Sequence, residues 1–354
     1  MVKENPTRDK LLTYMAVAAL LIFLWYAESH FSQYSLRIIN NIGIFIVLAV
    51  SYNLINGIAG QFSLGTNAFL AVGAYTSAIF TLSPEEKIRS FIIEPMIWPL
   101  SEISLSFPLS LLLAGVVTAL IALLVALPVF RVRGDYLAIV TLGFGEVVQV
   151  VANNVVSVTN GPLGIKGLAP HTNIWWSWGI CIFTVYCVVR LINSSYGRAM
   201  KAVREDETAA EAMGINAFRI KTLAFTCSAF FQGVAGGLLA HLITTISPSL
   251  FTFMLTFNLL IIIVIGGLGS TTGAVLSAIL ITWGSEALRI VEEPFTFFGY
   301  DYSGIPGMRM VLFSIILILV MLFARRGIMG RNEFKWSVLL NRFGRQSKSE
   351  ARTS

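Results

Sequence analysis

Few residues of this sequence have the types and spacing that a reaction or a bound cofactor requires. The phosphate-binding pattern G-x-x-x-x-G-K-[ST] does not occur, so we expect this chain to bind neither ATP nor its Mg²⁺. The three histidines lie far apart, and neither H-E-x-x-H nor C-x-x-C spacing occurs, so we expect no metal site. A G-x-S-x-G nucleophile elbow is also missing. The sequence therefore predicts no catalytic residue, no metal ligand, no cofactor and no enzyme activity.

One polar face lies within an apolar run and could contact a solute. Glu146, Gln149 and Asn153 follow three-four spacing, which places them on one face of a helix. A carboxylate near the middle of a membrane span costs roughly 2.5 to 3.5 kcal/mol, so this face must meet protein or water. Two interpretations stay open: the face lines a translocation path or contacts a partner subunit, or its hydrogen bonds only fix helix packing.

A second polar group follows two glycines, Gly57 and Gly60, early in the chain. Its members are Gln61, Ser63, Thr66 and Asn67. A helix that breaks at the glycines exposes backbone groups that only a cavity or neighbouring protein can satisfy inside a membrane. The pattern predicts that these four side chains belong to a translocation path.

A third group lies in a polar stretch, residues 196–216, between two apolar runs. It predicts a short helix outside the bilayer that ends near Gly214, a residue suited to a left-handed stop. Such a helix presents either a docking face for another protein or a face that lies on lipid. The acidic residues would be repelled by an anionic leaflet, which favours protein. The residues predicted to carry this contact are Arg204, Glu205, Asp206, Glu207, Ala209, Ala210 and Gly214.

The elements that must position these groups follow from composition. The chain has 354 residues, of which 56% are hydrophobic and 12% charged, and its mean hydropathy is +0.76. These values exclude a soluble domain and predict an all-α, polytopic membrane protein with about ten transmembrane helices, because each span needs about 20 apolar residues. The apolar runs are 11–27, 38–56, 63–82, 105–130, 136–156, 174–191, 222–246, 253–266, 273–290 and 310–324.

The basic residues predict the orientation. If both termini are cytoplasmic, nineteen of the 25 lysines and arginines lie inside and six outside, as the positive-inside rule requires. The net charge of +6 then reflects topology and attraction to anionic lipid, not nucleic-acid binding. The predicted organisation is a cytoplasmic N-terminus (1–10), a transmembrane domain (11–324) containing a cytoplasmic loop (194–219), and a basic cytoplasmic tail (325–354).

A weak internal repeat accompanies this organisation. Asn53-Leu54 precedes Leu64-Gly65-Thr66, and Asn258-Leu259 precedes Leu268-Gly269-Ser270, each at the predicted cytoplasmic mouth between two helices. Transporters contain repeats whose broken, glycine-rich segments line the pathway. Glycine-rich junctions are also common in membrane bundles for packing reasons alone, so the repeat stays a hypothesis.

Several longer strings resemble a known family. The stretch Thr208-Ala209-Ala210-x-x-x-Gly214 is similar to the EAA loop by which ABC importer permeases dock on their ATPases, with Thr208 where that motif has Glu. The other strings are RGDYLAIVTLGFGE (133–146), TNGPLGI (159–165), REDE (204–207), GIN (214–216), GQFSLG (60–65), GAYT (73–76) and GGLGS (266–270). Together, over about residues 36–330, they resemble the branched-chain amino-acid ABC permeases of the LivM type, in the LivH/LivM/urea-permease family.

The resemblance implies a transport subunit of a bacterial-type inner membrane that translocates leucine, isoleucine and valine. Its implied partners are a second homologous permease, two cytoplasmic ATPase subunits that bind ATP and Mg²⁺, and an extracytoplasmic binding protein. One departure bears on cargo, because Thr66-Asn67 stands where the family often has His after Leu-Gly. Urea, short amides or other amino acids therefore remain alternatives. A stand-alone ion-coupled transporter or channel is a further alternative, although Glu146 is the only carboxylate deep in a predicted span.

Overall fold

The computed structural model describes residues 6–91, 93–130 and 136–288, followed by 295–297, 300–302, 327–330, 332–334 and isolated residues between 308 and 322. Two units are compact by themselves: residues 37–331, and a second unit formed by 1–36 with 332–354. Helix α1 (Pro6–His30) belongs to the second unit, is mostly apolar from Leu11 onward and is largely exposed.

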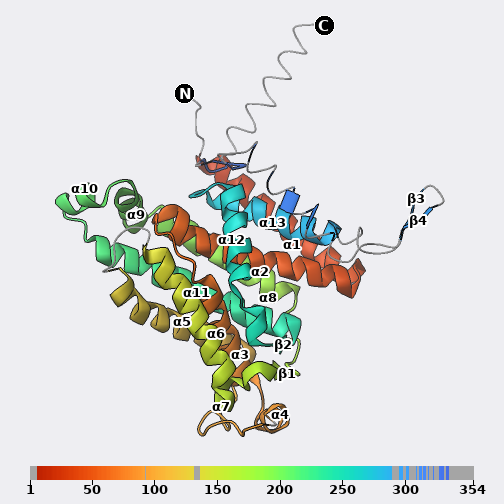
Figure 1. Cartoon of the computed structure of the whole chain (residues 1–354). Coiled ribbons are helices and arrows are strands. Elements are labelled where there is room, and N and C mark those ends of the chain that lie inside the picture. The colour runs from red at the N-terminus through yellow and green to blue at the C-terminus, as the bar shows by residue number, and fades with distance from the viewer. Residues whose placement is uncertain are drawn as a thin grey trace. The chain divides into compact units, whose positions relative to one another are not determined.

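The first unit is a helical bundle (Figure 1). Its long helices are α2 (Gln33–Asn53), which begins just before the unit, α3 (Thr66–Thr81), α5 (Phe107–Val129), α6 (Tyr136–Asn154), α8 (Ile174–Ile192), α11 (Ala217–Ile243), α12 (Phe253–Gly266) and α13 (Thr271–Ala287). The short elements are η1 (Leu54–Ile58), α4 (Pro84–Ser90), α7 (Val156–Thr159), η2 (Gly161–Leu163), β1 (Ile165–Lys166), α9 (Ser195–Glu205), α10 (Glu207–Ala212), β2 (Thr245–Ile246), η3 (Pro248–Leu250), β3 (Phe295–Phe297) and β4 (Tyr300–Tyr302).

Seven helical segments of the described chain are long and apolar enough to cross a membrane. They are Leu11–His30, Gln33–Ile58, Phe107–Val129, Tyr136–Asn154, Ile174–Ile192, Ala217–Ile243 and Pro248–Gly266. Two further predicted spans are the shorter helices α3 and α13, with 16 and 17 residues. The tenth, 310–324, and the tail, 325–354, lie mostly outside the described residues. The total of ten and the cytoplasmic placement of both termini stay predictions.

The described chain is mostly helical, as the composition predicted, but two antiparallel strand pairs were not anticipated. The β1 pair joins Ile165 to Ile246 and Lys166 to Thr245, across 80 residues of chain. Strands β3 and β4 pair with each other. The β1–β2 pair lies toward the end of the bundle where α4 and α7 are found, away from α9 and α10 (Figure 1).

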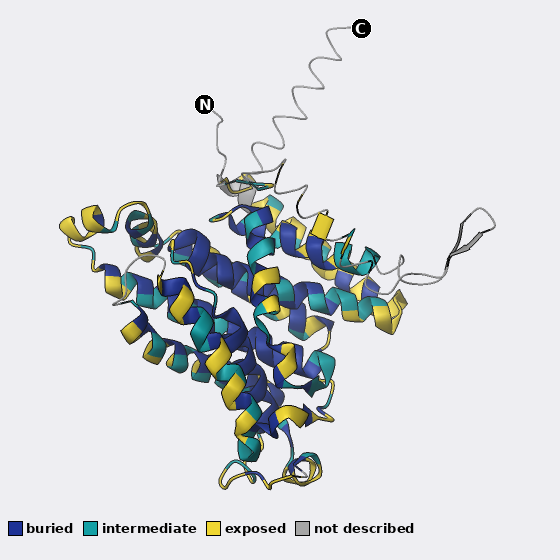
Figure 2. Ribbon diagram, viewed as in Figure 1, coloured by how far each residue is buried: buried dark blue, intermediate teal, exposed yellow. Residues whose placement is uncertain are grey.

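The core surrounds α11, which packs along α3 and α5 and is mostly buried (Figure 2). Glycines bring the helix backbones close together. A β-carbon at Gly236 would lie 2.2 Å from the Leu70 carbonyl oxygen, and one at Gly73 would lie 2.1 Å from the Gly233 carbonyl oxygen. Because lipid gives no hydrophobic drive for helix association, such close backbone packing is a main source of cohesion in a membrane bundle.

Beyond α3, an outer loop is held by one buried lysine. The Lys87 ammonium group donates hydrogen bonds to the carbonyl oxygens of Leu100 (2.6 Å) and Ile103 (2.5 Å). Burial lowers the pKa of Lys87, because desolvation disfavours its charged form. The same loop is tied to the β1 region, since the Ser90 hydroxyl donates to the Lys166 carbonyl oxygen.

The close packing of α11 on α3 can be tested by adding one methyl group. Gly236→Ala should destabilise the bundle by about 1–3 kcal/mol, because the new β-carbon meets backbone rather than a flexible side chain. Gly179→Ala on α8 is the matched control, since no atom lies within 4 Å of a β-carbon there. Thermal unfolding in detergent should show a lower midpoint for Gly236→Ala only; equal midpoints would contradict this packing.

Candidate functional site

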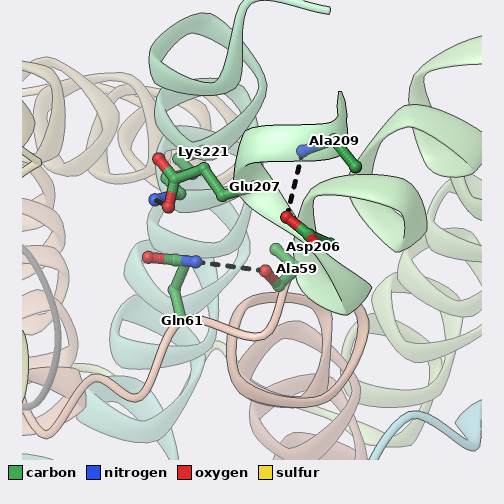
Figure 3. A network of polar contacts seen from close by, with 6 residues as sticks. All are labelled: Ala59, Gln61, Asp206, Glu207, Ala209 and Lys221. Atoms are coloured by element: carbon green, nitrogen blue, oxygen red, sulfur yellow. Dashed lines mark hydrogen bonds and ion pairs between the residues drawn. The ribbon is translucent and has the colours of Figure 1, made fainter. Parts of the chain in front are cut away.

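The polar segment between α8 and α11 folds as two short helices whose ends are set by side chains. Ser194 begins α9 by accepting a hydrogen bond from the Gly197 amide. Asp206 begins α10, because its carboxylate accepts from the Ala209 amide at 3.0 Å (Figure 3). Gly214, at φ +83°, follows the end of α10 in the left-handed region that glycine adopts without strain. We call α9 and α10 together the coupling segment.

The inner face of the coupling segment is anchored on α11. Val203, Ala210 and Ala217 form a buried apolar cluster. Beside it, the Lys221 ammonium group lies 2.6 Å from a Glu207 carboxylate oxygen (Figure 3). Lys221 is largely buried and Glu207 is partly exposed, so the ion pair and the apolar cluster together attach the segment to α11.

The outer face of the coupling segment is exposed to solvent. Ala209 is exposed whereas Ala210 is buried, so the two predicted contact alanines face opposite ways. Met213 exposes 83% of its surface, an unusual exposure for a large apolar side chain. The other exposed residues of this face are Glu205, Asp206, Thr208, Glu211, Ala212 and Gly214. The result is a small apolar surface bordered by carboxylates.

The glycine-rich chain after α2 breaks the helix. Helix α2 ends in the π-helical turn η1, and an irregular stretch, 59–65, leads to α3. Side chains satisfy this backbone: the Tyr52 hydroxyl donates to the Ser63 carbonyl oxygen at 2.7 Å, and the Ser63 amide donates to Asn56 Oδ1 at 3.0 Å. Gln61 is half-buried and donates to the Ala59 carbonyl oxygen (Figure 3). We call residues 57–65 the first glycine junction.

Thr66 and Asn67, predicted to line a path, are both buried inside this chain. The Asn67 amide side chain donates to the Phe251 carbonyl oxygen and accepts from the Thr256 hydroxyl. A β-carbon at Gly145 of α6 would lie 2.6 Å from Asn67 Oδ1, so no space remains between them. In this conformation Asn67 joins α3, α6 and α12. Its predicted role in a path stays a prediction.

Glu146, Gln149 and Asn153 lie on α6. Gln149 Nε2 donates to the Pro248 carbonyl oxygen at 3.4 Å, and Asn153 Nδ2 donates to the Gln149 carbonyl oxygen at 2.9 Å. Glu146 is exposed, as are Val147 and Val150 of the same helix. The structure therefore separates the predicted path residues into a buried set near Asn67 and a partly exposed set on α6.

Contacts between distant residues complete the site and were not anticipated. A second glycine junction, residues 266–270, follows α12, with Gly267 and Gly269 at φ +106° and +91°. The Gly269 amide donates to Asn53 Oδ1 at 2.9 Å. On the other side, Arg204 Nη1 donates to the Gly57 carbonyl oxygen at 2.7 Å. The sequence had singled out Asn53, Gly57, Arg204 and Gly269 separately, but it gave no signal that they meet.

No group of three or more histidine, cysteine or acidic side chains suited to a metal ion occurs in the part of the chain that the structure describes. Several membrane-length helices, glycine junctions and an external helical segment instead define a multi-pass membrane protein of the permease class. The family model for the branched-chain amino acid transport system permease component matches residues 34–324, and the chain belongs to this family, as a LivM-type permease.

The curated relatives are also branched-chain amino acid transport permeases. The high-affinity branched-chain amino acid transport system permease protein LivM of Salmonella typhimurium is 31% identical over 320 residues, which cover 81% of this chain and 68% of the relative. LivM of Escherichia coli K12 has the same identity and coverage. LivH of Escherichia coli K12 is 34% identical over 140 residues, 40% of this chain and 41% of the relative. No solved structure matches the chain.

The cap of α10 allows a local test of the coupling segment. Asp206→Ala should remove about 1 kcal/mol from α10, because the Ala209 amide loses its acceptor. Hydrogen exchange of the amides at 209–212 should then become about fivefold faster, from the same free energy. Glu211→Ala, an exposed change on the same helix, is the control. Unchanged exchange in Asp206→Ala would show that α10 does not depend on this cap.

Proposed function

We propose that this chain is a membrane-spanning subunit of an ATP-driven importer in a bacterial-type inner membrane. It translocates leucine, isoleucine and valine delivered by an extracytoplasmic binding protein. The family and the LivM relatives, whose names state branched-chain amino acid transport, support the cargo. ATP and Mg²⁺ bind to two partner ATPase subunits, consistent with the missing phosphate-binding pattern in this sequence.

The coupling segment is the observation that carries this proposal. It is fixed to α11 on its inner side and presents Ala209 and Met213 among carboxylates on its outer side. A segment that is rigidly attached to the spans yet exposed at its tip can receive a partner and pass on its movement. An importer of this kind switches between two conformations, and the ATPases shift the balance only if they bind one conformation more tightly.

The exposed face of α6 supports a second permease subunit. The exposed face of α5 is aliphatic, with Leu112, Leu120 and Leu124, and suits lipid. The face of α6 instead carries Glu146 among exposed valines. A carboxylate facing lipid is costly and is rare in membrane spans, so this face meets another subunit or the path between two subunits.

The proposed function is tested by purifying the subunit in mild detergent from its native membrane. We expect a second permease and ATPase polypeptides to co-purify, and vanadate-sensitive ATP hydrolysis to rise with leucine-loaded binding protein. Competition uptake then identifies the cargo: leucine, isoleucine and valine should compete, and urea and short amides should not. A chain that purifies alone, without crosslinked partners in intact membranes, would favour the ion-coupled transporter.

The outer face of the coupling segment can be tested by adding one charge at Ala209. Ala209→Asp should leave the protein inserted in the membrane but reduce transport and ATPase co-purification at least tenfold, because it adds a carboxylate to an apolar contact. Ala209→Ser, at the same exposed position, should retain transport. Normal transport by Ala209→Asp would remove this face from the mechanism.

The face of α6 predicts where the second permease binds. A photo-crosslinking amino acid at Val150, which is 57% exposed, should join this chain to the second permease. The same group at Leu120 of α5, which is 56% exposed, should react with lipid only. Crosslinks from Leu120 but not from Val150 would place the subunit contact on α5.

A further inference from the structure

Three segments far apart in sequence meet around Arg204, the penultimate residue of α9. A β-carbon at Gly57 would lie 2.4 Å from the Gly269 nitrogen, so the two glycine junctions touch through their backbones. The Gly269 amide also donates to Asn53 Oδ1. The third segment is the coupling segment, which reaches both junctions through Arg204.

The contacts of Arg204 are specific. Nη1 donates to the Gly57 carbonyl oxygen at 2.7 Å, and a β-carbon at Gly269 would lie 3.0 Å from Nη1. The aliphatic stem covers Gly60, where a β-carbon would lie 2.3 Å from Arg204 Cγ. Nη2 bonds the Glu205 carboxylate at 2.7 Å, and only 19% of the Arg204 side chain is exposed.

The position suits a cation. Helix α2 and η1 end at this point, and their last carbonyl groups carry the negative end of the helix dipole. A guanidinium group holds several donors in a rigid plane, so movement of α9 carries the bonded carbonyl with it rather than slipping past. Nε of Arg204 is buried and has no hydrogen-bond partner among the described residues, so the donor capacity of the group is not fully used in this conformation.

The two attachments of the coupling segment differ in kind. Toward α11 it is held by the apolar cluster of Val203, Ala210 and Ala217 and by the Lys221–Glu207 ion pair. Toward the first glycine junction, it is held by the hydrogen bond from Arg204 to the Gly57 carbonyl oxygen. Loss of Arg204 should therefore leave the segment folded and docked on α11.

We propose that Arg204 is the positioning residue that transmits displacement of the coupling segment to the two glycine junctions. This inference rests on the proposed function, in which an ATPase moves that segment. The junctions contain the residues at which α2 and α12 give way to α3 and α13. A pull on the Gly57 carbonyl acts on the first junction directly and on the second through the Gly57–Gly269 contact.

The experiment uses the complete importer, with Arg204→Gln as the main variant. We expect Arg204→Gln to assemble with its partners and to keep ATP hydrolysis stimulated by loaded binding protein, while leucine transported per ATP falls at least tenfold. Arg204→Lys, which can still donate to the Gly57 carbonyl, should recover part of this ratio. Arg198→Gln, an exposed arginine on the same helix, should retain the wild-type ratio.

A second variant, Gly60→Ala, changes the residue that the Arg204 stem covers. Gly60→Ala should also uncouple hydrolysis from transport, because its β-carbon displaces the Arg204 stem. Gly167→Ala is the control, since Gly167 has a similar φ of +77° but no atom within 4 Å of a β-carbon. If both changes break one linkage, the double variant Arg204→Gln with Gly60→Ala should lose no more coupling than either single variant.

The outcomes separate the two proposals. A wild-type complex without ATPase partners or stimulated hydrolysis would remove the proposed function itself. A functional wild type with an unchanged ratio of leucine to ATP in Arg204→Gln would overturn only the role of Arg204. Loss of assembly and hydrolysis together in Arg204→Gln would also overturn it, because Arg204 would then be needed for folding or docking rather than for transmission.

Discussion

The contact between the two glycine junctions constrains much of the surrounding structure. A β-carbon at Gly57 would lie 2.4 Å from the Gly269 nitrogen, so position 57 has no room for a side chain unless the backbone moves. Asn53 closes one side of this contact and Arg204 the other. The ends of α2 and α12, the starts of α3 and α13, and the coupling segment all meet there. A displacement at any of these elements therefore has to be accommodated by the others.

The helices around the two glycine junctions are closely packed, whereas the junctions themselves are irregular. Gly73, Gly233 and Gly236 bring α3 and α11 into backbone contact, and the coupling segment is fixed to the start of α11. The coupling segment is attached both to α11 and to the irregular first glycine junction. A movement of the segment is therefore suited to shift the junction relative to α11. This arrangement gives a physical basis for coupling in a permease that has no phosphate-binding pattern of its own.

Much of this fold could be predicted from sequence because membrane spans are encoded locally by apolar composition. The coupling segment was predictable in the same way, since Asp206 and Gly214 are local start and stop signals. Hydropathy predicts which part of a helix lies in the membrane, but not where the helix begins. Helix α11 begins at Ala217, before the predicted span at 222, because Asn216 caps it and its first turns are polar. The burial of Asn67 and the exposure of Glu146 depend on packing against distant segments, which local pattern does not contain. The Asn53–Gly269 hydrogen bond joins residues 216 apart, so local sequence pattern could not predict it either.

The proposed function requires that the outer face of the coupling segment receives an ATPase. The most direct measurement is photo-crosslinking in native membranes from Met213. The control is Ile88, which is 79% exposed and belongs to α4, at the other end of the bundle (Figure 1). We predict that a group at Met213 crosslinks to an ATPase polypeptide and that a group at Ile88 does not. Crosslinking of Met213 to lipid alone, or of the ATPase to Ile88 instead, would contradict this role of the coupling segment.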